Sequence, residues 1–281
     1  MTSTSSAWVA TSLAMIAFAA NSLLCRAALG SSATDPASFT MIRIVSGALA
    51  LVAISRLRGE GGAYRSGNLV SSIALFAYAA AFSFAYVTLA TGTGALLLFG
   101  AVQATMIGYG VLRGERLGML QMTGMLLAGF GLVGLLLPGA TAPPVVGSVL
   151  MIGAGVAWGV YSLRGRGSVR PLQDTAGNFV RAMPFALLLW LVFRPEWSIE
   201  MRGMLAAIAS GALASGIGYA IWYTALRSLR ATTAATVQLS VPVIAAAAGV
   251  VLLGESVGPR LVVASVAILG GIGLVLGRRR R

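Results

Sequence analysis

The chain has 281 residues and a net charge of +13, and 58% of its residues are hydrophobic while 10% are charged. Soluble globular proteins carry roughly 25% charged residues, so this composition excludes a soluble fold. The charge comes from 20 arginines, most of which lie between apolar segments, and that placement argues against nucleic-acid binding. The lone cysteine, Cys25, excludes an intrachain disulfide and leaves no cysteine cluster for a metal.

Ten apolar segments follow one another along the chain, each close to the roughly 20 residues that a helix needs to cross a bilayer. The residues before the first segment lack the basic region and cleavage site of a signal peptide, so we expect them to lead directly into a helix. The sequence predicts an all-α membrane protein with ten transmembrane helices, at 7–28, 37–55, 68–90, 93–112, 118–137, 145–163, 175–193, 203–226, 231–253 and 259–277.

The arginines in the gaps predict the orientation of these helices. With the N-terminus inside, fourteen arginines fall on the inner side and three on the outer side. Because inner loops of membrane proteins are rich in Lys and Arg, we expect both termini to face the cytoplasm of a bacterial inner membrane. The inner set is Arg56, Arg58, Arg65, Arg113, Arg116, Arg164, Arg166, Arg170, Arg227, Arg230 and Arg278 to Arg281, and the outer set is Arg194, Arg202 and Arg260.

The second half of the sequence repeats the first. Gly114-Glu115 recurs as Gly254-Glu255, in each case before a Gly-rich apolar segment. Two upstream stretches also match, Ala20–Arg26 with Trp158–Arg164 and Met41–Arg43 with Phe179–Arg181. Helices 1–5 (residues 1–140) therefore correspond to helices 6–10 (residues 141–281). Five is odd, so the two halves must insert with opposite orientation, which is the inverted repeat of many secondary transporters.

A five-helix unit that carries a Gly-Glu turn before its last helix, present twice, resembles the drug/metabolite transporter superfamily. More narrowly it is similar to the ten-helix exporters of the EamA type, including the YddG-like exporters of aromatic amino acids. The first half departs from the pattern, with Val102 where Pro242 stands in the second half and Ala20 where Trp158 stands. The residues that carry the resemblance are Gly114-Glu115, Gly254-Glu255, Trp158-Gly159 and Pro242.

The resemblance implies a carrier that exports small organic solutes by alternating access, with a central site between the two repeats. Amino acids are the first expected substrate class. Drug or cation efflux, and exchange of nucleotide sugars or sugar phosphates, are alternatives on the same architecture. We expect the lipid bilayer and a small solute as partners, and a monomer or weak homodimer.

Neutral polar side chains lie deep in three of the predicted helices. Gln103 is near the middle of the fourth, Gln238 is one turn before Pro242 in the ninth, and Asn21 is in the outer half of the first. Their carboxamides suit the carboxylate and ammonium of an amino acid, and they suit hydrogen bonds between helices equally well. We expect them to bind substrate, because the resemblance implies that helices 4 and 9 line the cavity.

Aromatic side chains form a second candidate set. Tyr78 and Phe82 share one face of the third helix, and Tyr219 and Trp222 mark a comparable face of the eighth. Together with Trp158 on the sixth, they predict an aromatic cavity with few polar groups, which suits a small amphipathic ligand. The alternative is that they pack in the core or in the interfacial belt.

No predicted helix has an Asp, Glu or His at its centre. The chain therefore has no candidate for a proton relay or for a catalytic acid, base or metal site, and we expect no enzyme activity and no cofactor. A membrane-embedded enzyme is thus disfavoured, whereas a passive lipid-binding or scaffold protein stays an alternative. An exchanger of sugar phosphates would need a cationic central site, and the candidates there are neutral.

Two arginines lie about two turns inside their predicted helices. Arg43 starts from the outer side and Arg181 from the inner side, as an inverted repeat requires. We expect gating or structural roles for them, with Arg43–Glu255 and Arg181–Glu115 as possible ion pairs and Pro242 as a structural residue. The alternative is that both arginines extend to the lipid headgroups.

Overall fold

The computed structural model describes residues 4–30, 34–59, 61–62, 65–114, 117–139, 141–193, 200–226, 229 and 236–277. Within these residues all regular structure is helical, and ten segments are long and apolar enough to cross a membrane. This confirms the predicted all-α membrane fold. The helices are α1 (Thr4–Leu29), α2 (Pro36–Leu57), α3 (Leu69–Tyr86), α4 (Thr91–Leu112), α5 (Met119–Leu136), α6 (Val145–Gly165), α7 (Pro171–Phe193), α8 (Met201–Ala209), the π-helix η2 (Ser210–Ile217), α9 (Gly218–Leu226), α11 (Ser240–Leu253) and α12 (Pro259–Gly277).

The eighth predicted helix differs from the expectation, because it is built from three pieces. An α-helix, a π-helical segment over Ser210–Ile217 and a second α-helix follow one another without a break. π-helical turns place side chains out of the α-helical register and are frequent at functional sites. In this segment small residues allow a close approach to α2, since a Cβ on Gly211 would collide with the Arg43 backbone.

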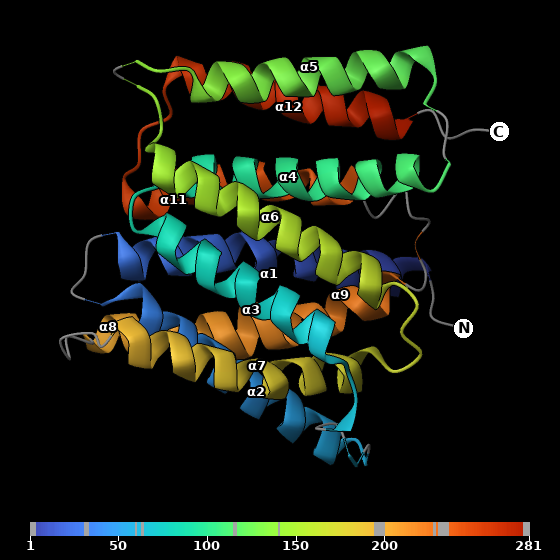
Figure 1. The fold of residues 1–281 in the computed structure, drawn as a ribbon, viewed down its shortest axis with the longest axis vertical. Helices are drawn as coiled ribbons and strands as arrows, with labels where there is room; N and C mark the ends of the chain where they lie inside the picture. Colours follow the sequence, from blue (N-terminus) through green and yellow to red (C-terminus); the bar gives the residue numbers. More distant parts are fainter. Residues whose placement is uncertain are drawn as a thin grey trace.

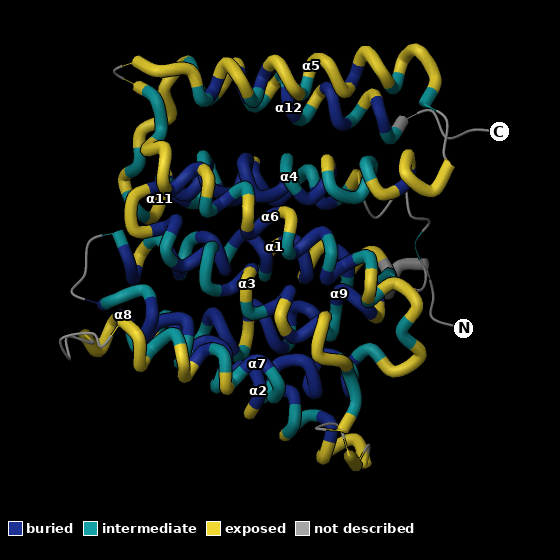
Figure 2. The backbone as a smooth tube through the Cα atoms, in the orientation of Figure 1, coloured by how far each residue is buried: buried dark blue, intermediate teal, exposed yellow. Residues whose placement is uncertain are grey.

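The helices are stacked in layers along the long axis of the molecule (Figure 1). At one end α5 packs against α12, and α4 with α11 forms the next layer. Helices α1, α3, α6 and α9 lie in the middle, and α2, α7 and α8 form the other end, with η2 leading from α8 to α9. Exposure is greatest along α5 (Figure 2), where Leu126 and Phe130 are exposed. An apolar helix with an open outer face fits contact with lipid.

Helix packing depends on small residues. Lipid tails are as apolar as the helices, so the hydrophobic effect contributes little to helix association in a membrane and close backbone contacts matter more. Gly124 of α5 and Gly271 of α12 face each other's backbone, and a Cβ on Gly155 of α6 would lie 2.5 Å from the Leu98 carbonyl oxygen of α4. Such contacts bring the backbones close together and fix which helices are neighbours.

The repeated Gly-Glu motif has a local structural reason. Gly254 ends α11 in the left-handed conformation with φ of 66°, and Gly114 follows α4 with φ of 90°. Residues with a Cβ rarely adopt this conformation. Each glycine thus stops its helix and turns the chain, and the turn at Gly254 directs Glu255 back toward the bundle, where its amide donates to the Gly249 carbonyl at 3.1 Å.

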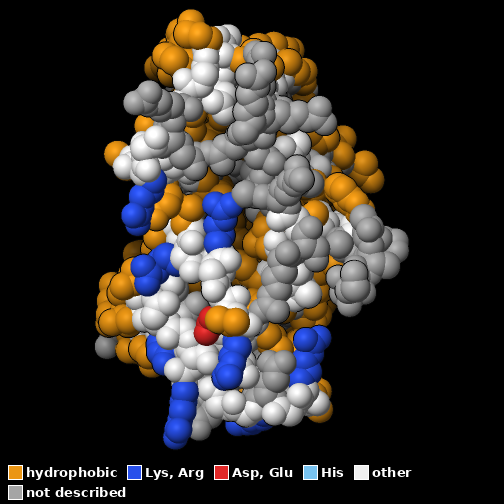
Figure 3. Space-filling view, turned by 90° about the vertical axis from the view of Figure 1, so that its right-hand side faces the viewer, with side chains coloured by type: hydrophobic (Ala, Val, Ile, Leu, Met, Phe, Trp, Pro, Cys, Tyr) orange, Lys and Arg blue, Asp and Glu red, His pale blue; other side chains and the backbone are white. Residues whose placement is uncertain are grey.

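Arginines gather at one end of the bundle, shown face-on in Figure 3. The first residue of α1 and the last residue of α12 lie at this end, together with the connections after α2, α4 and α6 (Figure 1). We refer to it as the predicted cytoplasmic end and to the opposite one as the predicted outer end; the orientation itself stays a prediction. The described arginines at the predicted cytoplasmic end are Arg56, Arg58, Arg65, Arg113, Arg164, Arg166 and Arg170.

Candidate functional site

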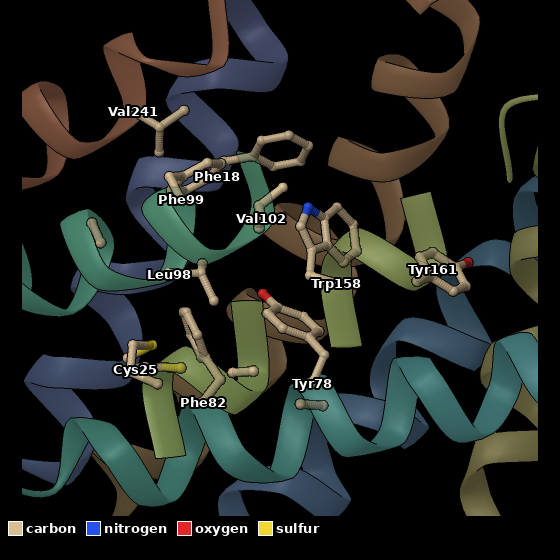
Figure 4. Packing of buried hydrophobic residues seen from close by; sticks show 14 of the residues in the cluster. Phe18, Cys25, Tyr78, Phe82, Leu98, Phe99, Val102, Trp158, Tyr161 and Val241 are labelled. Atoms are coloured by element: carbon tan, nitrogen blue, oxygen red, sulfur yellow. The ribbon is translucent and has the colours of Figure 1, made fainter. Parts of the chain in front are cut away.

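Aromatic rings from helices of both sequence halves meet at the centre of the bundle. The Trp158 ring on α6 lies 5.0 Å from the Tyr78 ring on α3 and 4.6 Å from the Tyr219 ring on α9. Phe18 on α1 packs edge-on against Trp158 at 6.0 Å. Figure 4 shows Tyr78, Phe82 and Trp158 directed toward one another.

These rings enclose a cavity of about 10 Å³, which has room for about one water molecule. The centre of the bundle is therefore closed, and a solute could enter only if the rings moved apart. The cavity is lined by Phe18, Asn21, Tyr78, Phe82, Leu98, Phe99, Trp158 and Tyr219.

A hydrogen-bond network runs along one wall of this cavity. Asn21 Nδ2 donates to Tyr78 Oη at 3.0 Å, and Ser210 Oγ donates to Asn21 Oδ1 at 2.6 Å. Tyr219 Oη also donates to Tyr78 Oη, at 3.3 Å. The network joins α1, α3, the π-helix and α9 through polar groups that are all buried, so it fixes the relative positions of helices from both halves.

Arg43 lies against this network and is 1% exposed. Its Nη2 donates to Tyr78 Oη at 2.9 Å and to Tyr219 Oη at 3.5 Å, and its Nε donates to Ser215 Oγ at 3.2 Å. The guanidinium also lies 5.1 Å from the Tyr78 ring centre and 5.0 Å from that of Phe82. The expected pairing of Arg43 with Glu255 is wrong, because Arg43 points into the bundle while Glu255 is held at a helix turn.

Glu255 pairs with Arg26 instead, at the predicted outer end. Arg26 Nε lies 3.2 Å from Glu255 Oε1, and the Thr91 amide donates to both carboxylate oxygens at 3.1 and 2.9 Å. Arg26 Nη1 also donates to the carbonyls of Tyr86 and Val87, each at 3.2 Å. Because the carboxylate sits at the N-terminus of α4, the helix dipole stabilises it as well. The cluster ties together the ends of α1, α3, α4 and α11.

Both ends of the bundle carry a pocket. The one at the predicted outer end has a volume of about 350 Å³ and is lined by Thr88, Thr93 and Arg260 among others; the one at the predicted cytoplasmic end reaches the aromatic cluster. This second pocket, of about 330 Å³, lies between α3, α6, α7 and α9. Arg164 projects into it and donates to Ser71 Oγ at 3.0 Å and to Asn68 Oδ1 at 2.9 Å. The remaining lining residues are Gly67, Tyr161, Gly165, Gly167, Ser168, Pro171, Asp174, Thr175, Asn178 and Tyr223. This pocket ends at Tyr161, whose ring is 5.5 Å from that of Trp158 in the central cluster.

Five of the predicted site residues line the central cavity together, and several others do not. Trp222 is buried beside Phe18, with ring centres 5.8 Å apart, but it does not line the cavity. Gln103, Gln238 and Pro242 are buried and also lie outside its lining. The five that line it are Asn21, Tyr78, Phe82, Trp158 and Tyr219.

The second intramembrane arginine is held by backbone. Arg181 donates to the carbonyls of Ser66, Gly177 and Arg65. Its suggested partner Glu115 lies outside the described residues, so that pairing is untested. In the part of the chain that is described, no three Asp, Glu, His or Cys residues lie close enough together to hold a metal ion.

Sequence inspection missed five contributors to the site: Phe18, Arg26, Leu98, Phe99 and Ser210. Phe18 could have been found, since it lies three residues before Asn21 on the same face of one helix. Arg26 also carried a signal, because it is the repeat equivalent of Arg164. Ser215 lies four residues before Tyr219 and shares its face, whereas Ser210 gave no signal, because its contact with Asn21 depends on how α1 packs against the π-helical segment.

Comparisons with known proteins agree with this architecture. The model of the EamA-like transporter family matches residues 145–277. An uncharacterized protein of Pseudomonas aeruginosa is 56% identical over 96% of this chain and 94% of its own length. The threonine/homoserine exporter RhtA of Escherichia coli (strain K12) is 30% identical over 136 residues, which are 44% of this chain and 43% of RhtA.

Among the solved structures that match, a crystal structure of another protein covers nearly the whole chain. The match has a TM-score of 0.71, with 97% of this chain and 99% of that chain covered at 22% sequence identity. At this identity the likeness establishes the fold alone.

Proposed function

This chain belongs to the EamA-like transporter family, and we propose that it is a carrier that exports small organic solutes, amino acids first, across a bacterial inner membrane. Membership in a transporter family supports a carrier rather than an enzyme. The substrate class, the direction of transport and the mechanism are what we propose. Support for amino acids comes from RhtA, a threonine/homoserine exporter that is similar to 44% of this chain.

The observation that carries the proposal is the central cavity. Its walls come from α1, α3 and α4 of the first half and from α6 and α9 of the second. Small-molecule sites are usually lined by apolar and aromatic side chains with a few converging polar groups, and this lining has both, although at about 10 Å³ the cavity must widen to admit a solute. Because both halves contribute, a relative movement of the halves would open and close it.

Helix contacts support the division into two inverted repeats. In the predicted repeat, α1, α2, α3, α4 and α5 correspond in that order to α6, α7, the α8–η2–α9 segment, α11 and α12. Three pairs of equivalent helices are in contact with each other: α2 with α7, α4 with α11, and α5 with α12. The α4–α6 contact also has its equivalent in α1–α11, and α3–α7 has its equivalent in the contact of α2 with η2 and α8. A two-fold relation between the halves would produce these pairs.

The two ends of the bundle support alternating access. The pocket at the predicted cytoplasmic end, about 330 Å³, reaches Tyr161, whose ring packs against Trp158. The predicted outer end also carries a pocket, of about 350 Å³, but no aromatic residue lines it, and Arg26 pairs with Glu255 at that end. The cavity between them has room for about one water molecule. This arrangement fits a cytoplasm-facing state in which the central site is closed, and an outward-facing state would require the Arg26–Glu255 contact to separate.

Counterflow in proteoliposomes tests the proposal. Vesicles containing the purified full chain are loaded with unlabelled L-threonine or L-phenylalanine and diluted into a trace of the same labelled amino acid. We expect a transient accumulation of label, since a carrier exchanges solute across the membrane faster than it moves net solute. Accumulation no greater than in protein-free vesicles for every amino acid tried would refute amino-acid export.

A further inference from the structure

Resting on the proposed function, we infer that the transported solute carries a carboxylate, and that Arg43 with the hydroxyls of Tyr78 and Tyr219 is its binding site. The central site is then cationic. This revises the expectation from sequence that the groups at mid-depth are neutral.

The first argument is the charge of Arg43. The guanidinium stays protonated at every physiological pH, and it is buried inside a membrane-spanning helix. None of the described acids forms an ion pair with it; these acids are Asp35, Asp174, Glu200 and Glu255. A buried charge without a counter-charge is costly, and within membranes such groups mark solute pathways. An anionic solute would supply the missing charge.

The second argument is a free donor. Nε and Nη2 of Arg43 are occupied by Ser215, Tyr78 and Tyr219, but Nη1 is buried and has no hydrogen-bond partner in the described structure. Buried donors are nearly always satisfied. Guanidinium binds a carboxylate through two parallel N–H groups, so Nη1 could bind one oxygen while Nη2 exchanges its weak contact with Tyr219, at 3.5 Å, for the other.

The third argument is the route from the cavity to this charge. Arg43 does not line the cavity, but Tyr78 and Tyr219 do, and both of their hydroxyls accept hydrogen bonds from Arg43 Nη2. A carboxylate that entered between the rings would meet these two hydroxyls first and the guanidinium behind them. The faces of Phe18 and Trp158 remain for the rest of the solute, such as an apolar side chain or an ammonium group.

The equivalent arginine of the second half shows what a structural role looks like. Arg181 is bound by three backbone carbonyls near the predicted cytoplasmic end, and it stacks on no aromatic ring among its described contacts. Arg43 differs in having one unused N–H₂ group and a cavity beyond its hydroxyl partners. Arg181 is therefore a matched control: both arginines lie in corresponding positions of the repeat, but only Arg43 lies beside the cavity.

The first experiment compares acids with amides on the wild-type full chain in detergent, by titration of tryptophan fluorescence. The probes are L-threonine and L-phenylalanine, each against its carboxamide, which keeps the side chain and the ammonium group but lacks the carboxylate. We expect each acid to bind at least about tenfold more tightly than its amide, a difference of about 1.4 kcal/mol. Equal binding of acid and amide, or tighter binding of the amide, overturns the inference.

Variants then identify the group responsible. Arg43→Gln should reduce the acid-over-amide preference to about twofold or less, while Arg181→Gln should keep the full preference even if it lowers the unfolding temperature. If Arg43→Gln does not fold, Tyr219→Phe keeps the ring, removes the hydroxyl and should weaken the preference several-fold. The assignment is overturned if Arg43→Gln folds and retains the wild-type preference for acid over amide. If Arg43→Gln does not fold, the same result for a folded Tyr219→Phe overturns it.

Transport of the same four probes separates the two levels of the proposal. If amides are carried and acids are not, the carrier function stands and the carboxylate inference alone fails. If no probe is bound or carried, the proposed amino-acid export fails, and the inference that rests on it fails as well.

Discussion

Arg26 and Glu255 form an ion pair, Nε to Oε1 at 3.2 Å, between residues 229 positions apart in the sequence. Glu255 also accepts two hydrogen bonds from the first amide of α4. One carboxylate thus holds the end of α1, the start of α4 and the turn between α11 and α12. The repeat equivalent of Arg26 is Arg164, which contacts Asn68 and Ser71 beside an open pocket. The two equivalent arginines therefore make different contacts at the two ends of the bundle.

Breaking this ion pair should make the predicted outer end more accessible. We expect Glu255→Gln to raise the rate at which a membrane-impermeant thiol reagent labels Thr93→Cys, which lines a pocket at that end, in a Cys25→Ala background. A partly exposed ion pair contributes about 1 kcal/mol or less, so the increase should not exceed roughly fivefold. Glu200→Gln is the control, because Glu200 is exposed, does not line this pocket and forms no ion pair among the described residues. Equal labelling of the wild type and Glu255→Gln would contradict a gating role.

The Tyr78 hydroxyl should contribute more to stability than that of its neighbour Tyr86 on α3. Tyr78→Phe removes the acceptor of three buried hydrogen bonds, from Asn21, Arg43 and Tyr219, and each donor left unsatisfied costs about 1–3 kcal/mol. Tyr86→Phe removes one 3.4 Å contact with the Thr91 carbonyl. Thermal unfolding in detergent should therefore show a clearly lower midpoint for Tyr78→Phe. Equal midpoints would mean that the network adds little.

Gln103 and Gln238 stay candidates for the solute pathway, although neither lines the closed cavity. We expect Gln103→Ala and Gln238→Ala to lower transport while stability stays nearly intact, because carboxamides at this depth can bind a polar solute once the rings separate. Counterflow and thermal unfolding of both variants check this. If both variants transport at the wild-type rate, the carboxamides serve helix packing.

The predicted topology places the 56–67 loop in the cytoplasm. In a Cys25→Ala background, Gly61→Cys should react with an impermeant thiol reagent only after cells are permeabilised, whereas Ser256→Cys should react in intact cells. A Cβ at Gly61 meets nothing within 4 Å, and both positions are exposed. Labelling of position 61 from outside intact cells would reverse the orientation.

Periodicity and hydropathy predicted the fold and much of the cavity. Tyr78 and Phe82 are four residues apart, so they had to share a face of α3, and Asn21 was identified by its depth in α1. The residues that the sequence could not place were those whose role depends on a neighbour from another helix. Nothing in the sequence distinguishes an Arg43 that pairs with Glu255 from one that stacks on Phe82, because depth alone does not set which way a side chain points.

The π-helix was missed for a related reason. Residues 203–226 read as one apolar helix, and average hydropathy is the same for α- and π-helical turns. The change of register over Ser210–Ile217 places Ser210 against Asn21 and Ser215 against Arg43. Only tertiary contacts reveal this register, and so the polar wall of the cavity could not be predicted in full.

The central claim, that solute crosses through the aromatic cavity, is tested most directly by filling that cavity. Leu98 lines it, so Leu98→Trp should obstruct it at an overpacking cost of about 1–3 kcal/mol. Leu126→Trp adds the same ring on the exposed face of α5, where the side chain is 61% exposed. In proteoliposome counterflow we expect Leu126→Trp to match the wild type and Leu98→Trp to retain no more than about a tenth of its rate, with thermal unfolding confirming that both are folded. A folded Leu98→Trp that transports at the wild-type rate would contradict the account.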